Sequence, residues 1–170
     1  AVTPLLSILT AGISGSARLH EKLGTTEALR AVDRCMKRIE RAVEAFDGDL
    51  IKTGGDEMMA AFHTADASVH AAIEMQQRIA DLPPVSGVKL AIRVGISCGE
   101  GETLGSLVDD EAAQEAALLT GQAKPAQILI SGKIKELLSA SLASQANEVE
   151  LGTSGSGGST YEVLLPDAPA

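Results

Sequence analysis

The chain has 170 residues, and 14 Lys and Arg against 23 Asp and Glu give it a formal net charge of −9. This acidic balance disfavours nucleic acid and anionic membranes as partners, because both are bound by clustered positive charge. Hydrophobic residues make up 45% of the sequence, which suffices for one domain over residues 1–170, with its core at about 5–165.

The cysteines and the chain start indicate the cellular setting. Cys35 and Cys98 lie in apolar stretches without CxxC spacing, which is typical of buried, reduced thiols and favours a cytoplasmic location. No run approaches the roughly 20 apolar residues of a membrane span, and no signal peptide opens the chain, so we expect no membrane contact by this fragment. A start at Ala1 rather than Met predicts a domain excised from a larger protein.

The first half of the chain predicts a strand, a long helix and a hairpin. Residues 4–13 are an apolar run typical of a strand, and the turn at 14–16 opens a charged helical segment. From Thr26 a long amphipathic helix is predicted by apolar residues at steps of three and four: Leu29, Val32, Met36, Ile39, Val43 and Phe46. Strands at 50–53 and 58–62 follow, joined by a turn in which two glycines permit a hairpin.

The second half adds helices and shorter strands. We expect a helix over 65–82, a central strand over 88–97, a turn-rich return over 99–105 and a helix over 109–119. The remaining elements are a strand at 127–130, a helix at 133–142, and a strand pair at 148–151 and 161–165 around a Gly/Ser loop at 152–159. This order predicts an α+β fold: a ferredoxin-like βααββαβ sheet core layered by helices, with a smaller C-terminal α/β tail.

Several stretches together resemble the class III adenylyl/guanylyl cyclase catalytic domain, also called the cyclase homology domain. They are LTAGISGSARL at 9–19 with EKLG at 21–24, IKTGGDEMMA at 51–60, IRVGISCGE at 92–100 and AKPAQILI at 123–130. The resemblance covers about residues 5–165. It implies cyclisation of a nucleoside triphosphate between two such domains, with two metal ions, Mg²⁺ or Mn²⁺, held by two aspartates.

The resemblance also marks the candidate site, in which one metal position is lost. Asp56 stands where the family keeps its second metal aspartate, and the alternative is an ordinary acid at a hairpin tip. Gly12 stands where the family keeps the first metal aspartate, and glycine has no side chain that could hold a metal. A paired two-metal centre needs more oxygen ligands than Asp56 alone provides.

Two further segments are candidates for nucleotide binding. Ser14, Gly15 and Ser16 could cradle phosphates with backbone amides at a helix start, or could be an ordinary helix cap. Lys52 matches the base-recognising lysine of adenylyl cyclases, and its alternative is a surface lysine at a strand end.

The largest departure from the family lies in the helix near residue 115. Active members carry an Asn that orients the ribose and an Arg that stabilises the transition state, and here these positions hold Gln114 and Leu118. The family's triphosphate-anchoring lysine is also missing, because no Lys or Arg follows Lys135. No complete catalytic set is therefore expected.

These departures favour a catalytically degenerate cyclase homology domain that acts as a dimerisation or regulatory signalling module. Its expected partner is a second copy or another cyclase-type domain, and any nucleotide binding would be weak and use Mg²⁺ or Mn²⁺. The alternative is an active adenylate cyclase that converts ATP to cyclic AMP, either by itself or only as a heterodimer. A lesser alternative is a relative of GGDE-type diguanylate cyclases, suggested by the four residues at 54–57.

Overall fold

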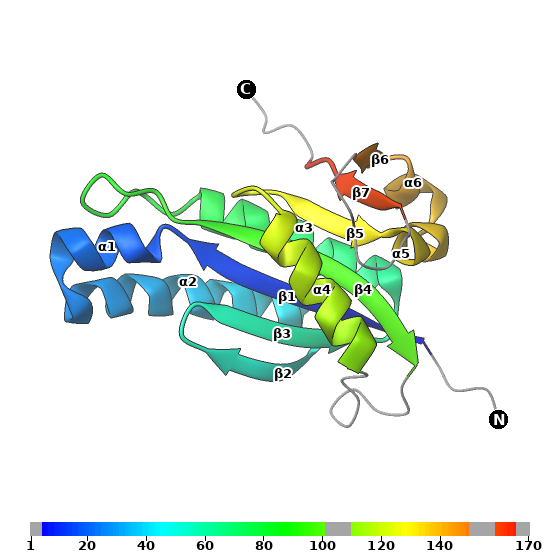
Figure 1. The fold of residues 1–170 in the computed structure, drawn as a ribbon, viewed down its shortest axis with the longest axis horizontal. Helices are drawn as coiled ribbons and strands as arrows, with labels where there is room; N and C mark the ends of the chain where they lie inside the picture. The colour runs from blue at the N-terminus through cyan, green and yellow to red at the C-terminus, as the bar shows by residue number, and fades with distance from the viewer. Residues whose placement is uncertain (1–4, 101–109, 150–158, 166–170) are drawn as a thin grey trace.

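The computed structural model describes residues 5–100, 110–149 and 159–165, with the backbone alone at 52 and 110 (Figure 1). In chain order the elements are β1 (Leu5–Ser14), α1 (Ser16–Leu23), α2 (Thr25–Ala45), β2 (Asp49–Gly54), β3 (Glu57–Phe62), α3 (Ala65–Ala80), β4 (Ala91–Glu100), α4 (Asp110–Gln122), β5 (Ile128–Ser131), α5 (Gly132–Leu137), α6 (Ala140–Ala143), β6 (Ala146–Val149) and β7 (Thr160–Val163). The βααββαβ order and the α+β class that the sequence predicts are confirmed.

The strands form one sheet in the order β2-β3-β1-β4-β5-β7-β6, with β1 near its middle. β1 pairs antiparallel with β3 and β4, whereas β4 and β5 run parallel. Helices α2 and α3 cover one face of the sheet, and α4 crosses the other face over β1 and β4 (Figure 1). Because both faces of β1 are covered, this strand reads as a nearly continuous apolar run.

Successive side chains of β1 point to opposite faces of the sheet. Leu9, Ala11 and Ile13 point into the main core beneath α2 and α3. Ile8 points the other way, into a small cluster with Ala112 and Ala116 of α4. The position of each side chain along β1 therefore decides which helix layer it meets.

Helix α2 forms where the periodic apolar residues predict it. Its buried stripe includes Val32, Cys35, Ile39 and Val43, spaced by three or four residues. A separate short helix, α1, precedes it, because Gly24 at φ 81° interrupts the helical backbone between the two.

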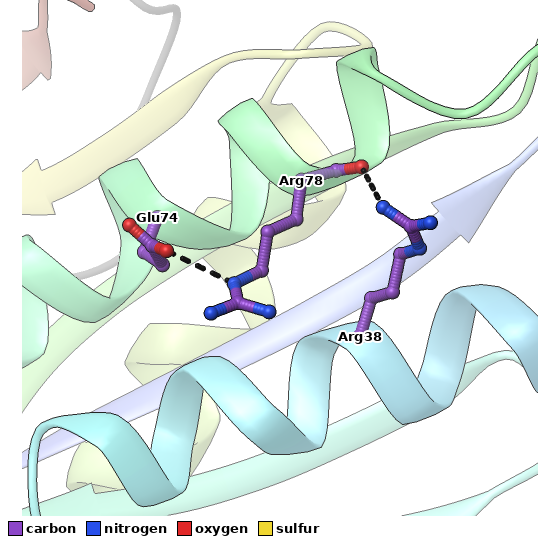
Figure 2. Close-up of polar contacts among 3 residues, drawn as sticks. All are labelled: Arg38, Glu74 and Arg78. Carbon is purple, nitrogen blue, oxygen red and sulfur yellow. Dashed lines mark hydrogen bonds and ion pairs between the residues drawn. The ribbon is translucent and has the colours of Figure 1, made fainter.

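Helices α2 and α3 are also tied by polar contacts (Figure 2). Arg38 of α2 donates from Nη1 to the carbonyl oxygen of Arg78 at 3.3 Å, near the C-terminus of α3. Arg78 in turn donates from Nε to Glu74 one turn earlier, at 3.0 Å. A cation at a helix C-terminus satisfies a free carbonyl and complements the helix dipole.

Two sequence predictions need correction. The helix predicted over 133–142 is two short helices, because Leu138 is extended and the backbone N–H of Ser139 donates to Asp66 Oδ1 at 2.8 Å. The strand predicted from residue 88 begins at Ala91, because a tight turn with positive φ at Ser86 and Gly87 precedes it. The predicted return over 99–105 and the Gly/Ser loop lie largely outside the described residues.

The cysteines are free, as the sequence predicts. Cys35 is buried in the core, and Cys98 is half-buried rather than buried. Burial raises the pKa of both thiols, and Glu115 raises that of Cys98 further. A raised pKa keeps a thiol protonated and unreactive near neutral pH.

Candidate functional site

A cavity of about 390 Å³ opens on the face of the sheet that α4 crosses. Its walls come from the end of β1 and the start of α1, from the β2–β3 turn, from β4 and from the C-terminal half of α4. The lining residues are Thr10, Gly12, Ile13, Ser14, Gly15, Ser16, Ala17, Asp56, Glu57, Arg93, Ala117, Thr120 and Gly121. A volume of this size suits a small molecule.

Gly12 lies on the floor of this cavity. In the sheet register it is opposite Glu57 of β3 on one side and Arg93 of β4 on the other. A Cβ atom built on Gly12 would meet Thr120 Cγ2 at 3.7 Å, an ordinary van der Waals contact. Packing therefore does not require glycine at this position, and the room that a larger side chain would fill is open.

Gly95 lies on the same face of the sheet and differs sharply from Gly12. A Cβ atom on Gly95 would lie 2.4 Å from the Ala116 carbonyl oxygen and 2.6 Å from the Thr120 nitrogen. Only glycine lets the backbone of α4 approach β4 this closely. This close approach positions the α4 wall of the cavity.

Asp56 sits at the β2–β3 turn and is held by two hydrogen bonds. Its carbonyl oxygen accepts from the backbone N–H of Ile13 at 2.7 Å. Its carboxylate Oδ2 accepts from Ser16 Oγ at 3.1 Å, which places negative charge at the N-terminus of α1. Asp56 thus has a structural role in joining the turn to β1 and α1.

Ser14, Gly15 and Ser16 form the wall where β1 meets α1. Gly15 is the N-cap of α1 in the left-handed region, at φ 101°, and no side chain caps the helix. Ser16 directs its hydroxyl to Asp56 instead. The structure therefore brings these three residues and Asp56 to one cavity.

The other candidate residues lie elsewhere. Gln114 and Leu118 are exposed on α4, with Leu118 43% exposed, and neither lines the cavity. The Lys52 backbone lies in β2 opposite Met59, and its side chain lies outside what the structure describes. Within this chain, Gln114 and Leu118 do not join Gly12 and Asp56 in one cavity.

Two cavity residues were missed by the sequence analysis. Arg93 Nε and Thr10 Oγ1 are both shielded from solvent and have no hydrogen-bond partner among the described residues. Arg93 could have been found, because it is a single cation within the apolar strand segment 90–96. A charge in such a strand is rare unless it has a function or a partner.

The cavity does not fit a pair of metal ions. Its acidic lining residues are Asp56 and Glu57, and one carboxylate oxygen of Asp56 already accepts from Ser16. Across the described ranges, no three His, Cys, Asp or Glu side chains gather as a metal site would require. Mg²⁺ is usually held by one or two carboxylates, with waters and substrate phosphates completing its shell. Here Gly12 offers no carboxylate and one oxygen of Asp56 is engaged, so the carboxylate pair that two ions would share is incomplete.

Comparison with known families gives one match. Residues 3–163 match the model of the adenylate and guanylate cyclase catalytic domain. A comparison with curated proteins found no match.

Comparison with solved structures finds the same fold. The guanylate cyclase domain of RhGC from Catenaria anguillulae, in complex with GTP, shares 17% identity, with 97% of this chain and 98% of that chain covered and a TM-score of 0.77. The adenylyl cyclase CyaB from P. aeruginosa shares 18% identity, with 98% and 96% covered and a TM-score of 0.74. A dimeric guanylyl cyclase domain from Blastocladiella emersonii shares 17% identity, with 95% and 96% covered and a TM-score of 0.76.

No helix within the described ranges has both the length and the apolar character needed to cross a membrane.

Proposed function

Because the chain belongs to the family of adenylate and guanylate cyclase catalytic domains, we propose that it is a member that does not cyclise nucleotides and acts as a dimerisation or regulatory module. The observation that carries this proposal is Gly12. It occupies the cavity floor between Glu57 and Arg93, where the resemblance to the family expects a metal-binding aspartate. Without that carboxylate, the two-metal activation of a ribose hydroxyl has no complete ligand set.

Leu118 supports the same proposal. The resemblance expects an arginine there, and Leu118 offers neither charge nor a hydrogen-bond donor from its exposed position on α4. Loss of a transition-state arginine lowers phosphoryl-transfer rates by about 10³-fold or more. No Lys or Arg follows Lys135 in the sequence, so the C-terminal part of this chain supplies no substitute.

The proposed assembly is a homodimer or a heterodimer with another cyclase-type domain. Leu118 is exposed on α4, and the half-buried Ile51 and Met59 pack at the edge of the small cluster beneath that helix. Apolar groups at one surface favour association. The same proposal places the domain in the cytosol, where Cys35 and Cys98 would remain reduced.

The decisive test is turnover of ATP and of GTP by the purified chain, with Mg²⁺ and with Mn²⁺. We expect no cyclic nucleotide above the rate of a sample without protein. An active cyclase homodimer assayed in parallel provides the positive control. Cyclic product formed by this chain alone would overturn the proposal.

Association is tested by analytical ultracentrifugation over a range of concentrations. Leu118→Glu should weaken self-association at least tenfold, because it places a charge in the proposed interface. The matched control is Leu137→Glu, which changes a leucine of similar exposure, 44% against 43%, on a different helix, α5. Equal effects of the two variants would contradict an interface at α4.

An active cyclase that works only as a heterodimer is the second candidate. It is favoured by the charged groups that the cavity keeps, Asp56 and Arg93. In that case mixing with a domain that supplies the missing metal-binding Asp together with the Asn, Arg and Lys would produce cyclic AMP, and Asp56→Asn would abolish it. The family match does not support the diguanylate cyclase alternative.

A further inference from the structure

The outer face of α2 carries a row of arginines that the fold does not use in ion pairs. Arg34, Arg38 and Arg41 are spaced four and then three residues apart, so they follow one ridge of the helix. Arg34 and Arg41 are exposed, and the half-buried Arg38 reaches toward the end of α3 (Figure 2). Among the described residues, none of the three forms an ion pair with a carboxylate. These guanidinium groups are therefore available to a partner.

The neighbouring cations differ, because each already has a partner within the chain. Three of them form ion pairs with acids on their own helix: Arg30 with Glu27, Lys37 with Asp33 and Arg78 with Glu74. Lys89 donates to carbonyl oxygens at the end of α3, including that of Ala80 at 2.8 Å. The unpaired groups of this face are thus all arginines.

A small apolar hollow lies beside Arg34. It has a volume of about 60 Å³ and opens between α2 and the segment that joins α3 to β4. Apart from Arg34 its lining is apolar: Ala31, Leu82, Pro83, Val85 and Leu90. Pro83 is exposed, and Leu82 and Val85 are half-buried, so the hollow lies at the surface. An aliphatic group that filled the hollow would lie next to the row of arginines.

The charge of this face is opposite to that of the chain as a whole. Glu40 lies across α2 from Arg38, which leaves Glu44 and Asp81 as nearby carboxylates that form no ion pair among the described residues. They do not balance the three arginines and Lys89, whereas the whole chain carries a charge of −9. This contrast favours a short negative segment, since a long polyanion or an anionic membrane would also meet the acidic remainder of the chain.

The chemistry of the face favours carboxylates and one aliphatic side chain. A guanidinium binds a carboxylate through two parallel N–H donors, a geometry that a lysine does not offer. Arginines spaced four and three residues apart on a helix match glutamates with the same spacing on a second helix that lies alongside. The hollow adds a contact for an aliphatic side chain, which a nucleic acid lacks.

We propose that this face docks an acidic helical segment of a partner protein, with carboxylates on Arg34, Arg38 and Arg41 and an aliphatic side chain in the hollow. The face lies on the opposite side of the sheet from α4 and the large cavity, so such a partner can bind while α4 is engaged in a dimer (Figure 1). The inference rests on the proposed function and deepens it, because it gives the regulatory module a kind of partner.

The test uses a fluorescein-labelled, alanine-rich peptide as the probe and fluorescence anisotropy as the readout. The peptide carries three glutamates spaced like the arginines and one leucine on the same face, and the purified chain is titrated into it at low salt. We expect saturable binding that added sodium chloride weakens. A peptide with glutamine in place of the glutamates should bind about tenfold more weakly, and one with serine in place of the leucine about threefold more weakly.

Two variants of the chain test the arginines. Arg34→Gln combined with Arg41→Gln should weaken binding of the glutamate peptide about tenfold, because it removes two ion pairs. Arg34→Lys combined with Arg41→Lys keeps the charge but loses the paired donors, and it should weaken binding about threefold.

The matched control is Lys124→Gln combined with Lys133→Gln, which removes the same charge from exposed lysines outside this face. It should bind the glutamate peptide within about twofold of the unchanged protein. Thermal unfolding by circular dichroism shows whether each variant keeps its fold. If the glutamine variant of the arginines does not, the lysine variant decides the question.

Three results would overturn the inference. The first is equal binding of the glutamate and glutamine peptides, and the second is no greater loss of binding in the Arg34 and Arg41 variants than in the lysine control. The third is tighter binding of an RNA oligonucleotide or of phosphatidylserine vesicles than of the glutamate peptide. Failure of the proposed function looks different, since it appears as cyclic nucleotide in the turnover assay. A chain that binds the glutamate peptide and also cyclises ATP would refute the proposed function alone.

Discussion

The two faces of the sheet differ in what fills them. Beneath α2 and α3 the side chains form one continuous apolar cluster, with Leu9 and Ile39 fully buried. Beneath α4 there are two small apolar clusters, around Ile8 and Leu129. The strands there also present Gly12, Gly95 and Thr10, and a cavity remains. The first face specifies the fold by apolar packing, whereas the second has room in which residues can change while the fold is kept.

The face beneath α4 is itself uneven. At Gly95 the helix backbone leaves no space for a side chain, and the buried Ser97 nearby donates a hydrogen bond to Glu115 of α4. At Gly12 the space is open. Close packing at Gly95 therefore fixes the position of α4, whereas the residue at position 12 can change without moving this helix.

The largest effect should come from truncating the apolar face. Leu9→Ala removes a fully buried side chain at the centre of the sheet and should lower the free energy of unfolding by about 2–5 kcal/mol. Urea denaturation followed by circular dichroism measures the change. Leu29→Ala, at a leucine that is 51% exposed, is the control and should alter it by less than about 0.5 kcal/mol.

A smaller effect separates the two glycines of the other face. Gly95→Ala should lower the free energy of unfolding by about 1–3 kcal/mol, because the new methyl group meets the α4 backbone. Gly12→Ala should leave it unchanged or raise it slightly, because the methyl group fits and the unfolded chain loses freedom. Equal losses in both variants would contradict the contrast between the two positions.

Restoring two family residues should have almost no effect on turnover. Gly12→Asp combined with Leu118→Arg should fold, yet cyclic nucleotide should stay at background, because Gln114 and the missing C-terminal lysine are unchanged. The same turnover assay with Mn²⁺ measures this. Substantial product would show that these two positions alone account for inactivity.

The smallest expected effect is on the rates at which the two thiols react. Cys35 lies in the centre of the apolar face and Cys98 at its edge, so their rates compare these two places. Burial raises the pKa of Cys35 and Cys98, so at pH 7 a thiol reagent should react with both more slowly than in urea. Cys35, which is buried, should react more slowly than the half-buried Cys98. Raising the pH toward the elevated pKa values should accelerate both reactions, because the thiolate is the reactive form.

Much of the fold could be predicted from the sequence, because the residues buried on the apolar face recur along the chain at the period of their helix or strand. The stripe of α2 and the run of β1 have the periods of a buried helix and a covered strand. The break between α5 and α6 could not be predicted, because it depends on a hydrogen bond from Ser139 to Asp66, 73 residues away. Such tertiary contacts leave no local pattern.

The sequence indicated some of the residues that line the cavity, but not the contacts among them. The resemblance pointed to Asp56 and the segment at 14–16, and these do line one cavity. It did not indicate that Ser16 donates a hydrogen bond to the Asp56 carboxylate, or that Arg93 and Thr10 line the same cavity as Gly12. Those relations follow from the register of β1 with β3 and β4, which sequence periodicity does not determine.

The bond from the Ile13 amide to the Asp56 carbonyl gives this protein a built-in reporter. It joins positions 43 residues apart in the sequence, so its hydrogen can exchange with solvent only when the β2–β3 turn swings away from the end of the central strand. The exchange rate of the Ile13 amide therefore measures how often the cavity opens at this turn. A compound bound in the cavity should slow the exchange of this amide in proportion to its occupancy.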